Sequence, residues 1–178
     1  MTTKLSLTTF SSPIGPLVVA AGPEGLVRLD LEGDRAQVEQ GLARRFEGCE
    51  VREARDPGGA VTALRRYFDG ELEALDALPV DPGGTEFQRR VWLTLRQIPA
   101  GTTWSYAQLA RAVNRPKAVR AVGATNGRNP LPLVLPCHRV IGSDGSLVGY
   151  GGGLDRKRWL LQHEGALRED RQARLELA

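Results

Sequence analysis

The chain has 178 residues and a mass of 19.3 kDa, which is enough for one domain or two small ones with a buried core. Hydrophobic residues make up 41% and charged residues 25%, and no apolar run approaches the about 20 residues that cross a bilayer. With no secretory signal at the start, two cysteines and two histidines, we expect a reducing, cytoplasmic setting, no membrane and no metal site.

Basic side chains are concentrated in the second half of the chain, although the net charge is only +3. Residues 1–80 carry 9 basic and 13 acidic side chains, whereas residues 81–178 carry 15 and 8. Residues 87–143 contain nine Lys or Arg and no Asp or Glu, where ordinary composition would place about half a dozen acids. This imbalance indicates a polyanionic partner such as nucleic acid, with compositional drift in an arginine-rich chain as the alternative.

The first part of the chain predicts a small antiparallel sheet with helices. Three apolar segments separated by turn-forming residues are typical of a strand meander: residues 5–10, 17–20 and 26–31. Residues 34–46 and 59–68 have apolar side chains at helical spacing, and residues 51–54 predict a further strand. The proline- and glycine-rich residues 78–84 indicate a connection to a second domain.

The second part is predicted to be mostly helical. Thr85 is a suitable N-cap for a first helix, and Ser105 for a short second one. Pro116 fits the first turn of a third helix, residues 117–126. Two short helices joined by a tight turn are typical of a helix-turn-helix motif.

These elements define an α/β (α+β) fold class. We expect an N-terminal α/β supporting domain at residues 1–80, with a small antiparallel sheet and helices. A mostly helical C-terminal domain with the helix-turn-helix follows at residues 81–166, and residues 167–178 form a charged tail.

One face of the third helix is unusually small. This face holds Arg120, Gly123, Ala124 and Gly127. The long side chain of Arg120 is therefore surrounded by residues with no side chain or only a methyl group. A helix that reads bases carries several long polar side chains instead. The small face therefore favours close approach to a narrow groove without base-specific contacts. Tight helix–helix packing is the alternative, but it does not explain Arg120.

Cys137 and His138 follow an apolar segment that contains prolines. A thiolate is the reactive form of cysteine, and a neighbouring histidine or basic field lowers the pKa of the thiol. Adjacent side chains of a strand point to opposite faces, so either the chain turns here or a water molecule bridges the two groups. A Cys-His pair by itself is more often structural, and Cys49 and His163 provide no zinc-ligand spacing.

The Cys-His pair belongs to a longer series of motifs. In chain order these are FQRRVW (87–92), IPAG (98–101), SY (105–106), RAVG (120–123), NP (129–130), PCHRV (136–140), GYGGGL (149–154) and WLLQHEG (159–165). Together they resemble the O6-methylguanine-DNA methyltransferases. SPIGPL (12–17) resembles the variable N-terminal domain of that family more loosely.

The resemblance implies a DNA repair protein that acts once. Such a protein flips an O6-alkylated guanine out of duplex DNA and transfers the alkyl group irreversibly to its own cysteine, with O4-methylthymine as a further substrate. The expected partner is double-stranded DNA containing O6-alkylguanine, bound by a cytoplasmic monomer. No cofactor is expected, because the chain contains neither a dinucleotide-binding fingerprint nor a P-loop.

The resemblance also assigns catalytic roles to five residues. Cys137 would be the nucleophile and permanent acceptor. His138 would act as its base through a bridging water, oriented by Glu164. Tyr106 would lie beside the flipped base and donate a proton to the leaving guanine, and Asn129 would link the recognition helix to the active-site turn.

The same resemblance implies contacts with DNA and with the base. Arg120 would fill the space left by the extruded nucleotide. The other expected DNA contacts are Tyr106, Ala121, Gly123, Ala124, Gly127 and Arg128. The expected wall of the base pocket is formed by Val140, Tyr150 and Gly151. Some family members carry a structural zinc, but here only Cys49 precedes residue 137 among cysteines and no histidine precedes His138, so we expect none.

Other function classes remain open from the sequence. An alkyltransferase-like protein binds such lesions without chemistry, but it lacks the acceptor that Cys137 provides. A helix-turn-helix transcription regulator would need a better base-reading face. A Cys-His hydrolase would turn over many times.

Overall fold

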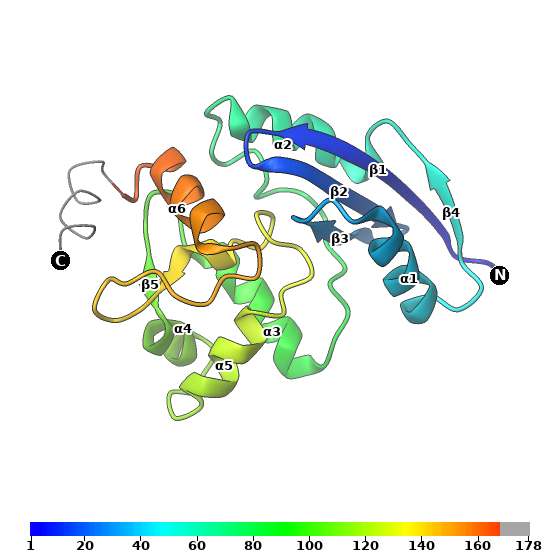
Figure 1. Cartoon of the computed structure of the whole chain (residues 1–178). Coiled ribbons are helices and arrows are strands. Elements are labelled where there is room, and N and C mark those ends of the chain that lie inside the picture. Colours follow the sequence, from blue (N-terminus) through cyan, green and yellow to red (C-terminus); the bar gives the residue numbers. More distant parts are fainter. Residues whose placement is uncertain (168–178) are drawn as a thin grey trace. The chain divides into compact units, whose positions relative to one another are not determined.

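Residues 1–167 are described in the computed structural model, and they divide into two units (Figure 1). The first comprises Met1–Gly84 with Pro130–Val134, and the second comprises Thr85–Asn129 with the described residues from Leu135. The division therefore lies a few residues beyond the predicted position. Residues 130–134 belong to the first unit, where the Leu29 amide donates to the Pro130 carbonyl at 2.9 Å. The predicted tail lies outside the described residues, except for Leu167.

A four-stranded sheet in the order β3-β2-β1-β4 forms the centre of the first unit. Its strands are β1 (Lys4–Ser12), β2 (Gly15–Gly22), β3 (Gly25–Asp30) and β4 (Glu50–Glu53). The first three are antiparallel neighbours, which confirms the predicted meander, and β4 pairs parallel to β1. The connection after residue 78 also contacts the sheet, because Val80 forms a parallel bridge with Leu26.

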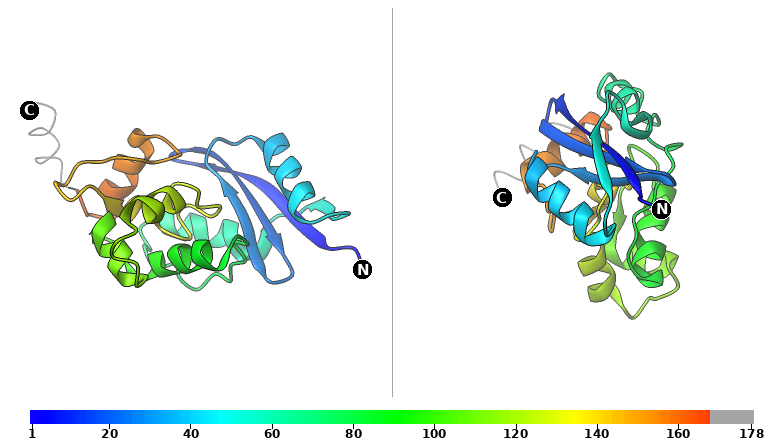
Figure 2. Two further views of the ribbon diagram at one scale, coloured as in Figure 1. Left: turned by 90° about the horizontal axis from the view of Figure 1, so that it is seen from below. Right: turned by 90° about the vertical axis from the view of Figure 1, so that its right-hand side faces the viewer.

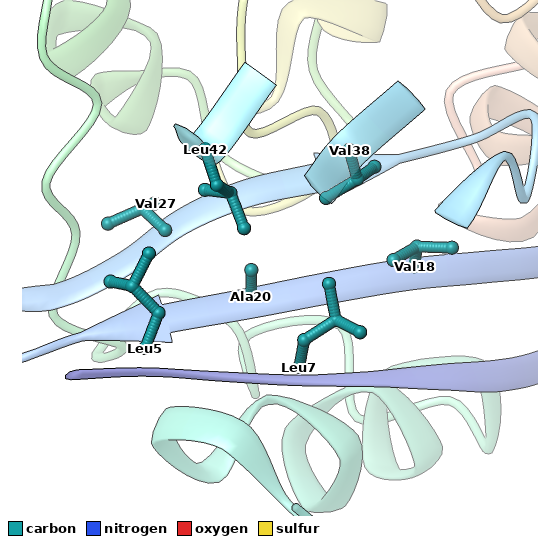
Figure 3. Packing of buried hydrophobic residues seen from close by; sticks show 7 residues of the cluster. All are labelled: Leu5, Leu7, Val18, Ala20, Val27, Val38 and Leu42. Atoms are coloured by element: carbon teal, nitrogen blue, oxygen red, sulfur yellow. The ribbon is translucent and has the colours of Figure 1, made fainter. Parts of the chain in front are cut away.

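Helices α1 (Arg35–Arg45) and α2 (Ala60–Phe68) cover opposite faces of this sheet (Figure 2). A short 3-10 turn, Pro57–Gly59, precedes α2. Alternate strand residues point to α1 and complete one apolar cluster, drawn in Figure 3: Leu5, Leu7, Val18, Ala20, Val27, Val38 and Leu42. On the α2 side, the rings of Phe10 and Phe68 lie 6.4 Å apart.

The second unit is mostly helical, as predicted. Its helices are α3 (Glu86–Thr94), α4 (Tyr106–Ala112), α5 (Val119–Asn126) and α6 (Leu154–His163), with 3-10 turns at Leu95–Gln97 and Cys137–Arg139. Thr85 and Ser105 cap α3 and α4 through complete capping boxes, which confirms both predicted N-caps. The short strands β5 (Trp104–Ser105) and β6 (Val140–Ile141) pair in parallel. This pairing holds the start of α4 beside the turn that carries the cysteine.

The start of the third predicted helix was placed wrongly. α5 begins at Val119, and Pro116 lies in the preceding turn rather than in the first turn of the helix. Asn114 adopts a left-handed φ of 59°, and the Ala118 amide donates to the Arg115 carbonyl at 2.9 Å, which closes a separate turn before the helix starts. Within residues 1–167, every helix is too short or too polar to cross a bilayer.

Candidate active site

Cys137 and His138 lie in one 3-10 turn, which follows Pro136. The Cys137 amide donates to the Leu135 carbonyl at 2.8 Å and fixes the start of this turn. The chain therefore turns at the pair, one of the two arrangements expected from the sequence. Cys137 is 5% exposed and His138 is fully buried. The Nδ1 atom of His138 has no hydrogen-bond partner within the described residues, so no direct bond joins it to the thiol.

The carboxylate of Glu164, at the end of α6, anchors the buried groups of the site. Its Oε1 lies 2.7 Å from Nε2 of His138. Arg139 binds both carboxylate oxygens, with Nε and Nη2 each at 2.9 Å. Arg139 also donates to the Ile98 carbonyl at 2.7 Å, so its guanidinium is held in place on two sides. The predicted pairing of His138 with Glu164 is present in this geometry.

These contacts determine the charge and the tautomer of the imidazole. Burial alone would raise the pKa of Glu164, but the hydrogen bond from His138 and the ion pair with Arg139 outweigh it and lower the pKa to about 2. Burial lowers the pKa of His138, against the raising effect of Glu164. A neutral imidazole beside an ionised carboxylate donates its Nε2 proton, which leaves Nδ1 as a hydrogen-bond acceptor.

The surroundings of the sulfur act on the Cys137 thiol in opposite directions. Burial raises its pKa to about 11, although the Asn129 amide, the Lys157 ammonium and the backbone amides of Cys137 and His138 act to lower it. Asn129 also donates from Nδ2 to the Leu135 carbonyl at 2.6 Å. It therefore connects the segment after α5 with the chain entering the cysteine turn.

Lys157 is a part of the site that the sequence analysis did not identify. It is fully buried in α6, and its Nζ donates to the carbonyls of Val140 at 2.6 Å and Val148 at 2.8 Å. Burial lowers the pKa of Lys157 to about 8, although the nearby Cys137 opposes this shift. A signal was present in the sequence, because Lys157 and Glu164 lie seven residues apart on the helix face of the buried leucines 160 and 161.

An open cavity of about 600 Å³ lies beside the cysteine turn. Its wall consists mostly of small residues together with two tyrosines: Tyr106, Val119, Arg120, Gly123, Ala124, Gly127, Gly149, Tyr150 and Gly151. Arg120, Ala124 and Gly127 are exposed. The exposed part of this face of α5 therefore borders the cavity and solvent, whereas Gly123 is half-buried against the ring of Tyr106 on α4.

Gly149 gives the Tyr106 hydroxyl its place in the wall. A Cβ at Gly149, which has a φ of +62°, would lie 3.3 Å from the hydroxyl, whereas a Cβ at Gly123 would make an ordinary contact of 3.5 Å with the tyrosine ring. The hydroxyl of Tyr106 donates to the Val148 carbonyl at 3.1 Å. Burial and the nearby Cys137 raise the pKa of Tyr106, so the phenol keeps its proton at neutral pH.

The remaining predicted site residues are placed in different ways. Val140 is fully buried and is not part of the cavity wall, and its carbonyl already accepts the Lys157 ammonium. Ala121 and Arg128 are exposed but lie outside the wall. Tyr150 lines the cavity, and its buried hydroxyl has no hydrogen-bond partner within residues 1–167.

The sulfur itself lies behind the wall. Cys137 does not line the cavity, but a thiolate there would raise the pKa of both Tyr106 and Tyr150, so the sulfur is close to both phenols. Across residues 1–167, His, Cys, Asp and Glu side chains form no cluster of three or more that could hold a metal ion.

Comparisons with known proteins cover both units. Residues 86–166 match the family model described as the DNA binding domain of 6-O-methylguanine DNA methyltransferase. Residues 5–82 match the ribonuclease-like domain of the same family. A methylated-DNA--protein-cysteine methyltransferase from Shigella flexneri is 48% identical over 160 residues, covering 88% of this chain and 94% of the relative. A protein of the same name from Mycobacterium tuberculosis is 45% identical over 159 residues, covering 88% and 90%.

Solved structures show the same similarity. The crystal structure of Mycobacterium tuberculosis O6-methylguanine methyltransferase is 40% identical, with a TM-score of 0.75 and coverage of 95% of this chain and 98% of that one. A crystal structure of Mycobacterium tuberculosis OGT in complex with DNA is 41% identical, with a TM-score of 0.73 and coverage of 92% and 93%.

The charge of Lys157 can be tested through the thiol. In Lys157→Met, loss of the ammonium should raise the pKa of Cys137 by about one unit or more. At pH 7, where Lys157 carries its charge, the rate of alkylation of the native protein by iodoacetamide, followed on the Cys137 peptide by mass spectrometry, should therefore fall by about tenfold or more. Lys117→Met removes the same charge from an exposed position and should leave the rate unchanged, with Cys49 as internal reference. An unchanged rate in a Lys157→Met protein with a normal thermal melt would contradict this role.

Proposed function

The chain belongs to the 6-O-methylguanine DNA methyltransferase family, and we propose that it repairs O6-alkylated guanine in duplex DNA by moving the alkyl group irreversibly onto Cys137. The observation that carries this proposal is the buried relay. An ionised Glu164 holds a neutral His138 beside the thiol, and a glycine-lined cavity lies next to it. A soft thiolate suits attack on an alkyl carbon, because the thioether product is stable.

Binding to DNA would rest on the exposed surface around α4 and α5. Five basic side chains are exposed there: Arg111, Arg115, Lys117, Arg120 and Arg128. They supply attraction to phosphates that does not depend on sequence, and the small face of α5 allows its backbone to approach the DNA closely. A repair protein must scan any sequence, so a helix without a base-reading face suits the task.

Arg120 is suited to assist base flipping. It is exposed at the rim of the cavity, beside the small residues of α5. Extruding a nucleotide costs a few kcal/mol, and a side chain that enters the vacated stack offsets part of this cost. The flipped base would then enter the cavity lined by Tyr150 and Gly151.

The first chemical step would be loss of the thiol proton. His138 Nδ1 is an acceptor without a protein partner, and it would take the proton of Cys137 through one water molecule. Glu164 stabilises the imidazolium that results. The amides of the cysteine turn and the Lys157 ammonium stabilise the thiolate.

Alkyl transfer would follow in one displacement. The sulfur of Cys137 forms a bond to the alkyl carbon while the bond between that carbon and guanine O6 breaks, and the electron pair of that bond remains on the guanine. Tyr106 supplies a proton to the leaving guanine, and the proton held on His138 restores the phenol through solvent. The sum is alkylguanine plus thiol giving guanine plus thioether, so each molecule acts once.

We also propose that the protein acts in the cytoplasm as a monomer and accepts a second substrate. The reaction consumes a reduced thiol, which favours a reducing compartment such as the cytoplasm. The cavity and relay belong to one unit of one chain, which suits action as a monomer. O4-methylthymine presents a comparable O-alkyl carbon and is proposed as a second substrate.

The main experiment measures the intact mass of the protein, and the masses of its peptides, by mass spectrometry after incubation with duplex DNA that contains one O6-methylguanine. The intact mass should increase by one methylene, at no more than one equivalent, and the increase should lie on the Cys137 peptide and not on the Cys49 peptide. Cys137→Ser should show no transfer and near-normal affinity for the same DNA. A parallel duplex with O4-methylthymine tests the second substrate.

Other outcomes of this experiment would identify the competing functions. Repeated turnover would contradict single use and favour a hydrolase. Binding of the lesion without any mass increase would favour a non-catalytic alkyltransferase-like protein. Preference for one DNA sequence regardless of the lesion would favour a regulator.

A second experiment tests the flipping role of Arg120. In Arg120→Ala, single-turnover repair of a paired O6-methylguanine should slow by about tenfold or more, because flipping loses its filler side chain. The defect should be smaller for a mismatched or single-stranded lesion, which costs less to extrude. Arg44→Ala removes an exposed arginine from α1 and serves as the control. Equal slowing on paired and single-stranded lesions would indicate a general DNA-binding role instead.

A further inference from the structure

The first unit has an open sheet edge along the second half of β1. β4 pairs only with the first half of β1, from Lys4↔Glu50 to Leu7↔Glu53. The last contact is the Ala54 amide donating to the Leu7 carbonyl at 3.1 Å, after which the chain leaves the sheet. Residues 8–12 therefore have a strand neighbour only on the β2 side.

The pairing register shows which backbone groups lie on this edge. The amide and carbonyl of one strand residue point to the same side, and the side alternates along the strand. Because the Leu7 carbonyl points toward β4, the amides and carbonyls of Thr9 and Ser11 point to the same open side. The partner of Ser11 on β2 is Pro16, which has no amide proton, as expected for a pair without hydrogen bonds. Within residues 1–167, the amides and carbonyls of Thr9 and Ser11 make no backbone hydrogen bond on this open side.

A cavity of about 590 Å³ lies along this edge. Its lining comes from β1, from the chain that leaves β4, and from α2: Thr8, Thr9, Phe10, Ser11, Glu53, Ala54, Arg55, Val61 and Arg65. We call it the β1 groove. All of its residues belong to the first unit, so it is separate from the cysteine site.

The charge of the β1 groove is positive. Arg55 and Arg65 are exposed, and neither has a carboxylate partner within the described residues. The guanidinium of Arg65 lies 5.9 Å from the centre of the Phe10 ring, which orients it along the groove. Glu53 is the one carboxylate in the lining, and it is already engaged: it accepts from Thr8 Oγ1 at 2.9 Å and pairs at 2.7 Å with Arg35, which also binds Glu39.

We propose that the β1 groove binds an extended, acidic peptide segment of a partner protein, which adds to the sheet as a strand beside residues 9–12. Thr9 and Ser11 offer alternating donors and acceptors, which another peptide backbone complements and a phosphate chain, having only acceptors, does not. Carboxylates of the segment would pair with Arg55 and Arg65. This inference does not depend on the alkyl transfer reaction.

The test uses the full chain and a defined probe, a fluorescein-labelled nine-residue peptide that alternates threonine and glutamate. Fluorescence anisotropy should show saturable binding. Arg55→Glu combined with Arg65→Glu should weaken it by about tenfold or more, since attraction becomes repulsion. Arg44→Glu combined with Arg66→Glu, at exposed positions outside the groove lining, changes the charge by the same amount and is the control.

The backbone contacts are tested separately. Ser11→Pro removes an amide proton that the sheet does not use, so binding should weaken by roughly three- to tenfold while Ser11→Ala binds normally. A peptide N-methylated at alternate residues should bind more weakly than the parent peptide. Methyl transfer from O6-methylguanine should be unchanged in every folded variant, which keeps this test distinct from that of the proposed function.

Three outcomes would overturn the proposal. The first is no binding of the probe at millimolar concentration. The second is equal binding of the N-methylated peptide, which would show attraction by charge alone. The third is tighter binding of a single-stranded oligonucleotide that depends on Arg55 and Arg65, which would assign the groove to nucleic acid.

Discussion

The buried carboxylate of Glu164 is the interaction on which the rest of the site depends. It accepts hydrogen bonds from His138 and from Nε and Nη2 of Arg139, so its charge is compensated without solvent. Removing one partner of such a buried pair typically costs about 3–5 kcal/mol, because the other charge stays uncompensated. The carboxylate also fixes the imidazole as an Nε2 donor, and this leaves Nδ1 as a hydrogen-bond acceptor. His138 and the next residue, Arg139, thus both bind the same carboxylate, so Glu164 fixes the turn that carries Cys137.

The second constraint is the absence of side chains around the cavity. Gly123 weakens α5, since glycine in a helix costs up to about 1 kcal/mol relative to alanine. Ala124 and Gly127 on the same face are exposed, so this part of the face does not serve internal packing. The cavity beside Tyr106 is left open as a result. Stability is therefore reduced locally beside the cavity, where the proposed function places the DNA.

Several elements could be predicted because their signals are local. Thr85 and Ser105 each begin a capping box, and the turn formers between the first three strands specify antiparallel neighbours. The start of α5 could not be predicted, because a separate turn at Arg115 competes with the helix preference of Pro116. Lys157 was missed because burial of a lysine depends on distant carbonyls, here those of Val140 and Val148, which only the folded chain brings together. The open edge of β1 was equally hidden, since it depends on where β4 stops pairing.

The protonation state of His138 is the property that the buried carboxylate determines: a neutral ring with Nδ1 free to accept a proton. It can be measured by nitrogen NMR of the full chain labelled at its two histidines, with His163→Gln to assign the signals. At pH 7 His138 should be neutral with the proton on Nε2, and its pKa should lie below the ordinary value of histidine. An imidazolium at pH 7, or a neutral ring with its proton on Nδ1, would contradict it.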